Sequence, residues 1–163
     1  MVFDDVIRTG QLRLKGKIED GGVLFAHDYS KNGYVIAQRI RYTTNGVDAL
    51  GVVLFYQNPP RHQLSDAGLV EYVKALEIIA KNKRDYNFLI VFGRNHPYHA
   101  GADIKENYER LIIASEESKL STYLKWSDER LSKFVGMVQL IDEISQSGVV
   151  AVSIASGHPF GGS

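Results

Sequence analysis

The sequence has no cysteine in its 163 residues, which excludes disulfide bonds, a thiolate nucleophile and a zinc site built on thiolates. It also has no excess of either charge, because 19 lysine and arginine residues balance 19 aspartate and glutamate residues. A neutral chain has no overall field that attracts nucleic acid or an anionic membrane, so any anion site has to be local. We therefore expect neither nucleic acid nor a membrane among its partners.

Long hydrophobic runs are missing as well, and no stretch approaches the roughly 20 apolar residues that cross a bilayer. Residues 1–5 include two acids and have neither the basic part nor the apolar part of a signal peptide. Together with the lack of cysteine, this pattern favours a cytoplasmic protein. The remaining composition, 44% apolar and 23% charged, is typical of one globular domain.

Alternating apolar residues in the first third of the chain predict antiparallel strands. We expect one turn at residues 19–22 and a second at residues 44–48. The second turn leads into an apolar run at residues 50–56, which is rich in β-branched and aromatic residues, as in a buried strand. The sheet is therefore expected to begin with an antiparallel hairpin.

The period of the apolar residues changes after residue 60 and becomes helical. One helical face consists of Leu69, Tyr72, Val73, Leu76, Ile79 and Ala80. Ser65 or Asp66 is expected to cap this helix, and apolar runs at residues 87–93 and 148–155 predict two more buried strands. A second helix is expected to begin at Ser127. Its predicted apolar face consists of Leu131, Phe134, Val135, Val138 and Ile141. Strands that alternate with amphipathic helices predict an α/β fold with a mainly parallel sheet.

Small residues follow two of the predicted strands, at residues 100–102 and 160–162. Loops at the ends of strands are the usual ligand sites of open α/β sheets, and small side chains let a ligand reach backbone N–H groups. The same residues also suit turns that need glycine for its backbone conformation. The pattern by itself leaves both interpretations open.

Two other pairs of residues are weaker candidates for chemistry. His96 and His99 have a spacing that suits a metal, but no third histidine or clustered carboxylate completes a ligand set, so we expect no metal. Ser156 and His158 suggest a nucleophile and a base, but residues 151–155 lack both glycines of a nucleophile elbow. A zinc enzyme and a serine hydrolase are both disfavoured.

The order of residues around the two small loops is more informative than their composition. Residues 99–106 read His-Ala-Gly-Ala-Asp-Ile-Lys-Glu, and residues 157–163 read Gly-His-Pro-Phe-Gly-Gly-Ser. These segments resemble the two oxyanion motifs of the crotonase, or enoyl-CoA hydratase/isomerase, superfamily, and the likeness covers approximately residues 34–163. It implies a crotonase-like α/β fold (the ClpP/crotonase spiral of ββα units). On this basis residues 1–33 are expected to form a β-rich N-terminal extension, and residues 34–163 the N-terminal part of the core, incomplete at the C-terminus.

The resemblance also implies a site. The backbone N–H groups of Ala102 and Gly162 would bind the carbonyl oxygen of an acyl-CoA thioester and stabilise its enolate. Four residues would contact coenzyme A, which belongs to the substrate, and no other cofactor is implied: Ala100, Ile104, Lys105 and Arg61. Asp103 is expected to cap a helix from residue 104 to about residue 115 rather than to act as a base.

The function implied by this resemblance is that of an enoyl-CoA hydratase or isomerase. The catalytic glutamates of the family would lie beyond Ser163, and the complete protein would form a homotrimer or hexamer or use a complementing C-terminal chain. Two alternatives remain: a cyclic oxoacyl-CoA hydrolase of the same superfamily, and a non-catalytic CoA-binding or split subunit that lacks the general base. Residues 111–113 and 123–126 could line an enlarged acyl pocket or belong to the ordinary core.

Overall fold

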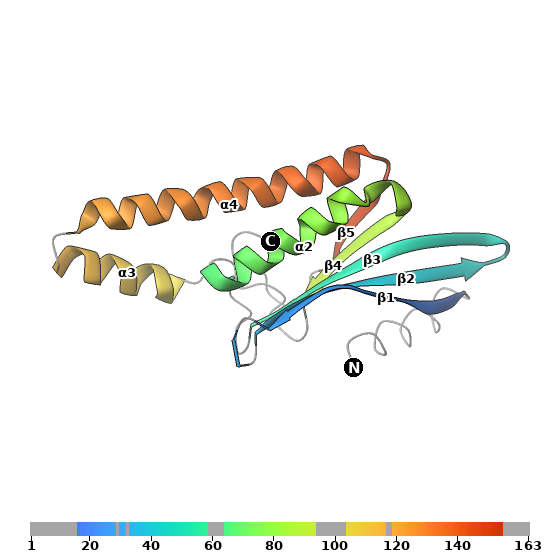
Figure 1. Cartoon of the computed structure of the whole chain (residues 1–163), viewed down its shortest axis with the longest axis horizontal. Coiled ribbons are helices and arrows are strands. Elements are labelled where there is room, and N and C mark those ends of the chain that lie inside the picture. Colours follow the sequence, from blue (N-terminus) through green and yellow to red (C-terminus); the bar gives the residue numbers. More distant parts are fainter. Residues whose placement is uncertain are drawn as a thin grey trace.

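Five strands form one mixed sheet in the order of the chain, from β1 at one edge to β5 at the other (Figure 1). This computed structural model describes residues 16–28, 30–31, 33–58, 64–93, 104–116 and 119–154. The strands are β1 (Lys17–Asp28), β2 (Tyr34–Thr44), β3 (Val47–Gln57), β4 (Phe88–Gly93) and β5 (Val150–Ile154). β1, β2 and β3 are antiparallel, whereas β3, β4 and β5 are parallel. The sheet is thus mixed rather than mainly parallel, because only the two connections that contain helices can join parallel neighbours.

The two turns expected near the N-terminus have different outcomes. The second is confirmed, since Asn45 and Gly46 have positive φ values of 44° and 81° and join β2 to β3. The first is wrong, because β1 continues through residues 19–22 and only changes its register between Asp20 and Val23. Gly22, with a φ of 91°, donates its N–H to Asp20 Oδ1 at 2.6 Å. This stretch forms a bulge within one strand instead of a turn between two strands. β1, which lies in the predicted extension 1–33, is therefore part of the same sheet as the later strands.

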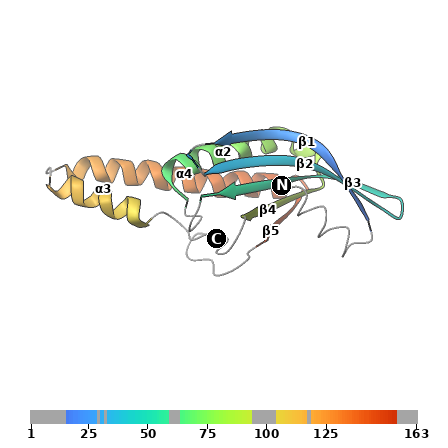
Figure 2. The same cartoon turned by 90° about the horizontal axis from the view of Figure 1, so that it is seen from below.

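Three α-helices follow the antiparallel strands. They are α2 (Asp66–Lys81), α3 (Ile104–Glu116) and α4 (Leu120–Gln146), and a short 3₁₀ helix, η1 (Lys83–Asp85), follows α2. α2 and α4 lie side by side on one face of the sheet (Figures 1 and 2). Ser65 is confirmed as the N-cap of α2, because its side chain accepts a hydrogen bond from the Gly68 N–H at 3.2 Å. The start of α4 at Ser127 is wrong, since the helix begins seven residues earlier.

The main core lies between the sheet and these two helices. It contains Val35, Ala37, Val52, Leu54, Tyr56, Leu69, Tyr72, Leu76, Ile79, Leu89 and Ile144, among others. The predicted apolar face of α2 is confirmed, because most of its residues are buried and Val73 packs against the core. The predicted face of α4 is only half correct: Phe134 and Ile141 pack on this core, whereas Leu131, Val135 and Val138 are exposed.

Tyr86, which follows η1 and belongs to this core, should make the stability of the protein depend on pH. Its side chain is buried, and burial raises the pKa of the phenol above its usual 10.0, with Arg39 opposing the change and Asp85 adding to it. A folded-state pKa above the unfolded value means that the folded state keeps the proton longer, so stability is lost as pH rises above 10. Phenylalanine cannot ionise, so the free energy of unfolding of the unmodified protein should fall relative to that of Tyr86→Phe only above pH 10. A difference that stays constant with pH in urea unfolding would contradict this.

Candidate functional site

The carboxyl ends of β4 and β5 lie next to each other at one edge of the sheet. The two strands are parallel neighbours, and Phe92 is paired with Ile154 at their ends. The segments that follow the two strands therefore start from adjacent points of the same edge. These are the two segments that carry the predicted oxyanion motifs. In open α/β sheets, this edge is where ligands bind.

Most of the predicted site residues lie outside the described residues. This is the case for Arg61, Ala100, Ala102 and Gly162, and also for Asp103 and the histidines and serine considered above. Two predicted CoA contacts are described: Ile104 is the first residue of α3, and Lys105 follows it in the first turn. The side chain of Lys105 is 81% exposed and lies 3.5 Å from Glu109, one turn further along the helix. The predicted helix after Asp103 is confirmed by the bounds of α3.

A buried arginine holds the start of α3 on the body of the protein. Arg130 of α4 is only 6% exposed, and its Nη1 donates to Asp66 Oδ1 at 2.6 Å and to Glu106 Oε2 at 3.1 Å. Its Nη2 donates to the carbonyl oxygen of Leu64 at 2.7 Å. Asp66 and Glu106 stand in the first turns of α2 and α3, where the helix dipole favours a negative charge. One guanidinium group thus joins the beginnings of two helices and the residue before α2's cap.

Two more side chains complete this cluster. Trp126 donates its indole N–H to Asp66 Oδ2 at 2.5 Å, and Arg110 donates to the same oxygen at 3.2 Å. The Arg110 guanidinium lies over the Trp126 ring, 4.6 Å from its centroid, and the Arg130 guanidinium lies 5.4 Å from it. Every charge in the cluster has an opposite charge or an aromatic face beside it, which matters most for Arg130, the only charged group of the five that is buried. We name these five residues, Asp66, Glu106, Arg110, Trp126 and Arg130, the charge cluster.

The charge cluster was missed by sequence reasoning, although one signal was present. Trp126, Arg130 and Phe134 are spaced by four residues, so they share one helical face, and an arginine between two aromatic residues on such a face indicates a buried partner. A helix that begins at Ser127 leaves Trp126 outside this face, whereas α4 begins at Leu120 and includes it. Asp66 does not cap α2, because Ser65 has that role.

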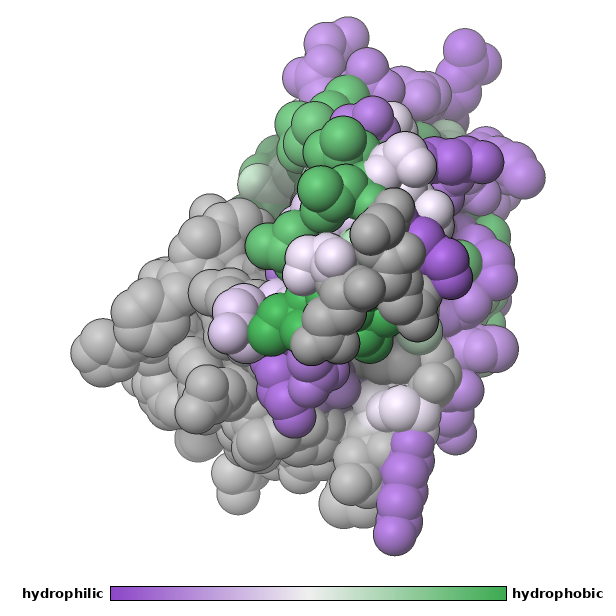
Figure 3. Space-filling view, turned by 90° about the vertical axis from the view of Figure 1, so that its left-hand side faces the viewer, coloured by the Kyte–Doolittle hydropathy of each residue, from purple (hydrophilic) through white to green (hydrophobic). Residues whose placement is uncertain are grey.

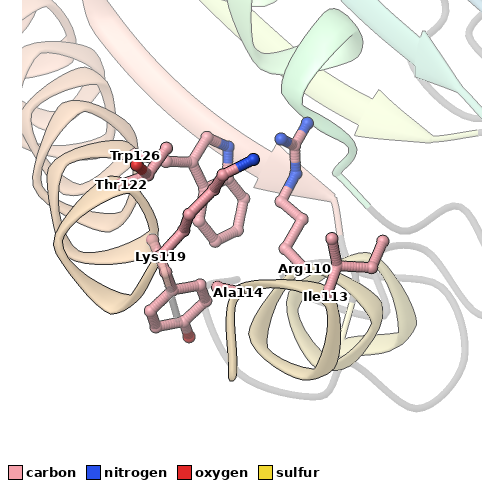
Figure 4. Close-up of a pocket in the computed structure, with 7 residues that line it drawn as sticks. Arg110, Ile113, Ala114, Lys119, Thr122 and Trp126 are labelled. Atoms are coloured by element: carbon pink, nitrogen blue, oxygen red, sulfur yellow. The ribbon is translucent and has the colours of Figure 1, made fainter. Parts of the chain in front are cut away.

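A cavity of about 190 Å³ lies between α3 and α4, next to the charge cluster (Figure 4). It is lined by Arg110, Ile113, Ala114, Lys119, Thr122, Tyr123 and Trp126. Tyr123 and Trp126 meet at a ring distance of 5.6 Å, and Figure 4 shows Arg110 extending from α3 towards the start of α2. Three residues of the expected acyl pocket, Ile113, Tyr123 and Trp126, thus share a cavity. Its walls are largely apolar, which suits a hydrocarbon group.

Exposed hydrophobic residues continue from this region along α4. Leu111 and Leu124, expected in the pocket or the core, are 40% and 60% exposed. A stripe on α4 consists of Leu120, Leu124, Leu131, Val135 and Val138. Figure 3 looks onto the free end of α3 and α4 and shows hydrophobic residues gathered there beside hydrophilic ones. Val150 and Val152 on the edge strand β5 are exposed too. Exposed hydrophobic residues that line up along one helix face, as on α4, are typical of an interaction site.

Comparisons with known families and curated proteins gave no match: no model of a known protein family matches the chain, and no curated protein is similar to it. Across residues 16–154, apart from the segments that the structure leaves out, no group of three histidine, aspartate or glutamate side chains could hold a metal ion. In the same part of the chain, no helix is long and apolar enough to cross a membrane.

Proposed function

We propose that the protein binds an acyl-CoA thioester and stabilises its enolate, as an enzyme of the enoyl-CoA hydratase/isomerase type with a crotonase-like fold. The observation that carries this proposal is the pairing of β4 with β5, because it starts both motif-bearing segments at one edge of the sheet. A carbonyl oxygen held by one N–H group from each segment needs this proximity. α3, whose first three residues are the last three of the first motif, is fixed to the body by the charge cluster.

The proposed chemistry is the transfer of a proton at the carbon next to the thioester. A base removes this proton, the C–H electron pair forms the enolate double bond, and the carbonyl oxygen takes the negative charge. The N–H groups of Ala102 and Gly162 donate to this oxygen, and they suit the task because backbone donors are fixed before the reaction. Ala100, Ile104, Lys105 and Arg61 hold the coenzyme A part. The base is a carboxylate that neither motif contains, and the reaction takes place in the cytoplasm.

The exposed stripe on α4 and the exposed valines of β5 favour one elaboration of this proposal. The protein acts within an assembly, as a homotrimer or hexamer or together with a complementing chain, since solvent contact with this much apolar surface is unfavourable. A complementing chain would make the protein a split subunit, and it would be the source of the base. Light scattering of the purified protein gives its assembly state directly.

The cavity between α3 and α4 is proposed to receive the far end of the acyl chain. Its lining residues on α3, from Arg110 to Ala114, lie six to ten residues after Ile104, which is about 9–15 Å at a rise of 1.5 Å per residue. Only a long acyl group spans that distance from the predicted oxyanion segment. The proposal therefore favours long-chain over short-chain acyl-CoA.

Replacing Ala114 by phenylalanine should fill this cavity. Each buried methylene contributes about 0.8 kcal/mol to binding. If two or more methylenes of the acyl chain can no longer enter the cavity, binding of dodecanoyl-CoA should weaken by roughly tenfold or more. Butyryl-CoA, which does not reach the cavity, should bind as before. Ser115→Phe adds the same side chain one residue further on, outside the lining, and serves as the control. Equal weakening for both acyl lengths in calorimetric titrations would contradict the assignment.

The proposed function is tested with butyryl-CoA in D₂O. Enolate stabilisation lets a buffer base exchange the α-hydrogens, so this readout does not depend on where the enzyme's own base lies. We expect binding by calorimetry and exchange, followed by mass spectrometry, that is faster than in buffer alone. Binding without accelerated exchange would support the non-catalytic CoA-binding subunit. The absence of both binding and exchange would overturn the proposal.

A further inference from the structure

We propose that Arg130 is a positioning residue for the proposed reaction, because it fixes Leu64 relative to Glu106 beside the predicted substrate-binding residues. The inference rests on the proposed function and adds a residue to it that no motif contains. Arg130 binds the carbonyl oxygen of Leu64, three residues after Arg61, and the carboxylate of Glu106, four residues after Ala102. A single buried side chain therefore fixes Leu64, near the predicted coenzyme A contact Arg61, and Glu106, the last residue of the first motif.

The geometry of these contacts requires a guanidinium group. Arg130 makes three hydrogen bonds with two different nitrogens, Nη1 towards the two carboxylates and Nη2 towards the Leu64 carbonyl. A planar fork holds such partners in fixed directions, whereas the ammonium of lysine is a single point on a flexible stem. Arg130→Lys keeps the charge but cannot reach all three acceptors with the same geometry.

The remaining bonds of the charge cluster support the same role. The backbone N–H of Asp66 donates to Glu106 Oε2 at 3.2 Å, so the starts of α2 and α3 are joined directly as well as through Arg130. Glu106 is also the last residue of the first motif. This gives that glutamate a function, namely to connect the oxyanion segment to the body of the protein. Positioning of this kind matters for catalysis, because a displacement of about 1 Å at a reacting group can cost a hundredfold in rate.

The test compares Arg130→Lys with a control on the same helix. Ile144→Ala removes a fully buried side chain 14 residues away, so it destabilises α4 without touching the charge cluster. For each protein we would measure the α-hydrogen exchange rate of butyryl-CoA, its dissociation constant and the free energy of unfolding. At equal loss of stability, Arg130→Lys should slow exchange by roughly tenfold to a hundredfold, and Ile144→Ala should not. Trp126, the only tryptophan of the chain, should change its fluorescence in Arg130→Lys alone.

Each outcome of this comparison decides the inference. If Arg130→Lys loses no more exchange activity than Ile144→Ala, Arg130 has a structural role only and the inference is wrong, while the proposed function stands. If the unmodified protein neither binds butyryl-CoA nor accelerates exchange, the proposed function and the inference both fail. Should Arg130→Lys not fold, Glu106→Gln, which keeps the shape of the side chain and removes its charge, replaces it with the same expected result.

Discussion

Replacing Ala102 by proline should lower the α-hydrogen exchange rate of bound butyryl-CoA by about a hundredfold to a thousandfold. Proline has no backbone N–H, so the substitution removes one of the two proposed donors to the enolate oxygen. Loss of one such donor typically has an effect of this size, because the charge develops only as the proton leaves. Affinity for free coenzyme A should change far less, since the oxyanion donors contact the thioester carbonyl.

Ala102→Gly is the matched control for this experiment. It changes the side chain by one methyl group and retains the N–H, so exchange should stay close to that of the unmodified protein. Gly162→Pro should repeat the loss seen with Ala102→Pro from the other segment. If Ala102→Pro and Ala102→Gly were equally active, the backbone of this residue would not be a donor, and the oxyanion assignment would be wrong.

Strong local patterns made much of the fold predictable from the sequence. β3, β4 and β5 were found as apolar runs, and α2 and α3 as helices with the expected starts. The turn expected at residues 19–22 failed because Asp-Gly-Gly suits both a tight turn and a bulge. The hydrogen bond from the Gly22 N–H to Asp20 can form in a tight turn and in a bulge. Only the pairing of β1 with β2 shows that these residues form a bulge.

The charge cluster could not be predicted in the same way, because its contacts join distant parts of the chain. Arg130 is 64 residues from Asp66 and 24 residues from Glu106. No local period links them, and their meeting depends on how α2, α3 and α4 pack. On α4 the difficulty is different, because a local pattern is present but predicts the wrong buried face. Leu131, Val135 and Val138 have a helical spacing that predicts a buried face, but the core lies under a neighbouring face.

The buried apolar face of α2 and the exposed apolar face of α4 should respond very differently to the loss of a leucine side chain. Leu76→Ala should lower the free energy of unfolding by about 2–5 kcal/mol, because Leu76 is fully buried between α2 and the sheet and its loss leaves a cavity. The same change at Leu131, which is 62% exposed, should stay within about 0.5 kcal/mol in the monomer. Urea unfolding of both variants at low protein concentration gives the comparison.

The Leu131 variant also tests whether the stripe on α4 is covered in solution. Burial by a second chain stabilises the folded state by mass action, so the cost of Leu131→Ala would then increase with protein concentration. The cost of Leu76→Ala, within one chain, should show a weaker dependence or none. A cost at Leu131 that rises with concentration would support the assembly, since it requires a partner on the stripe. A cost that stays small at every concentration would contradict a homo-oligomer formed through this face and would leave a complementing chain as the partner to seek.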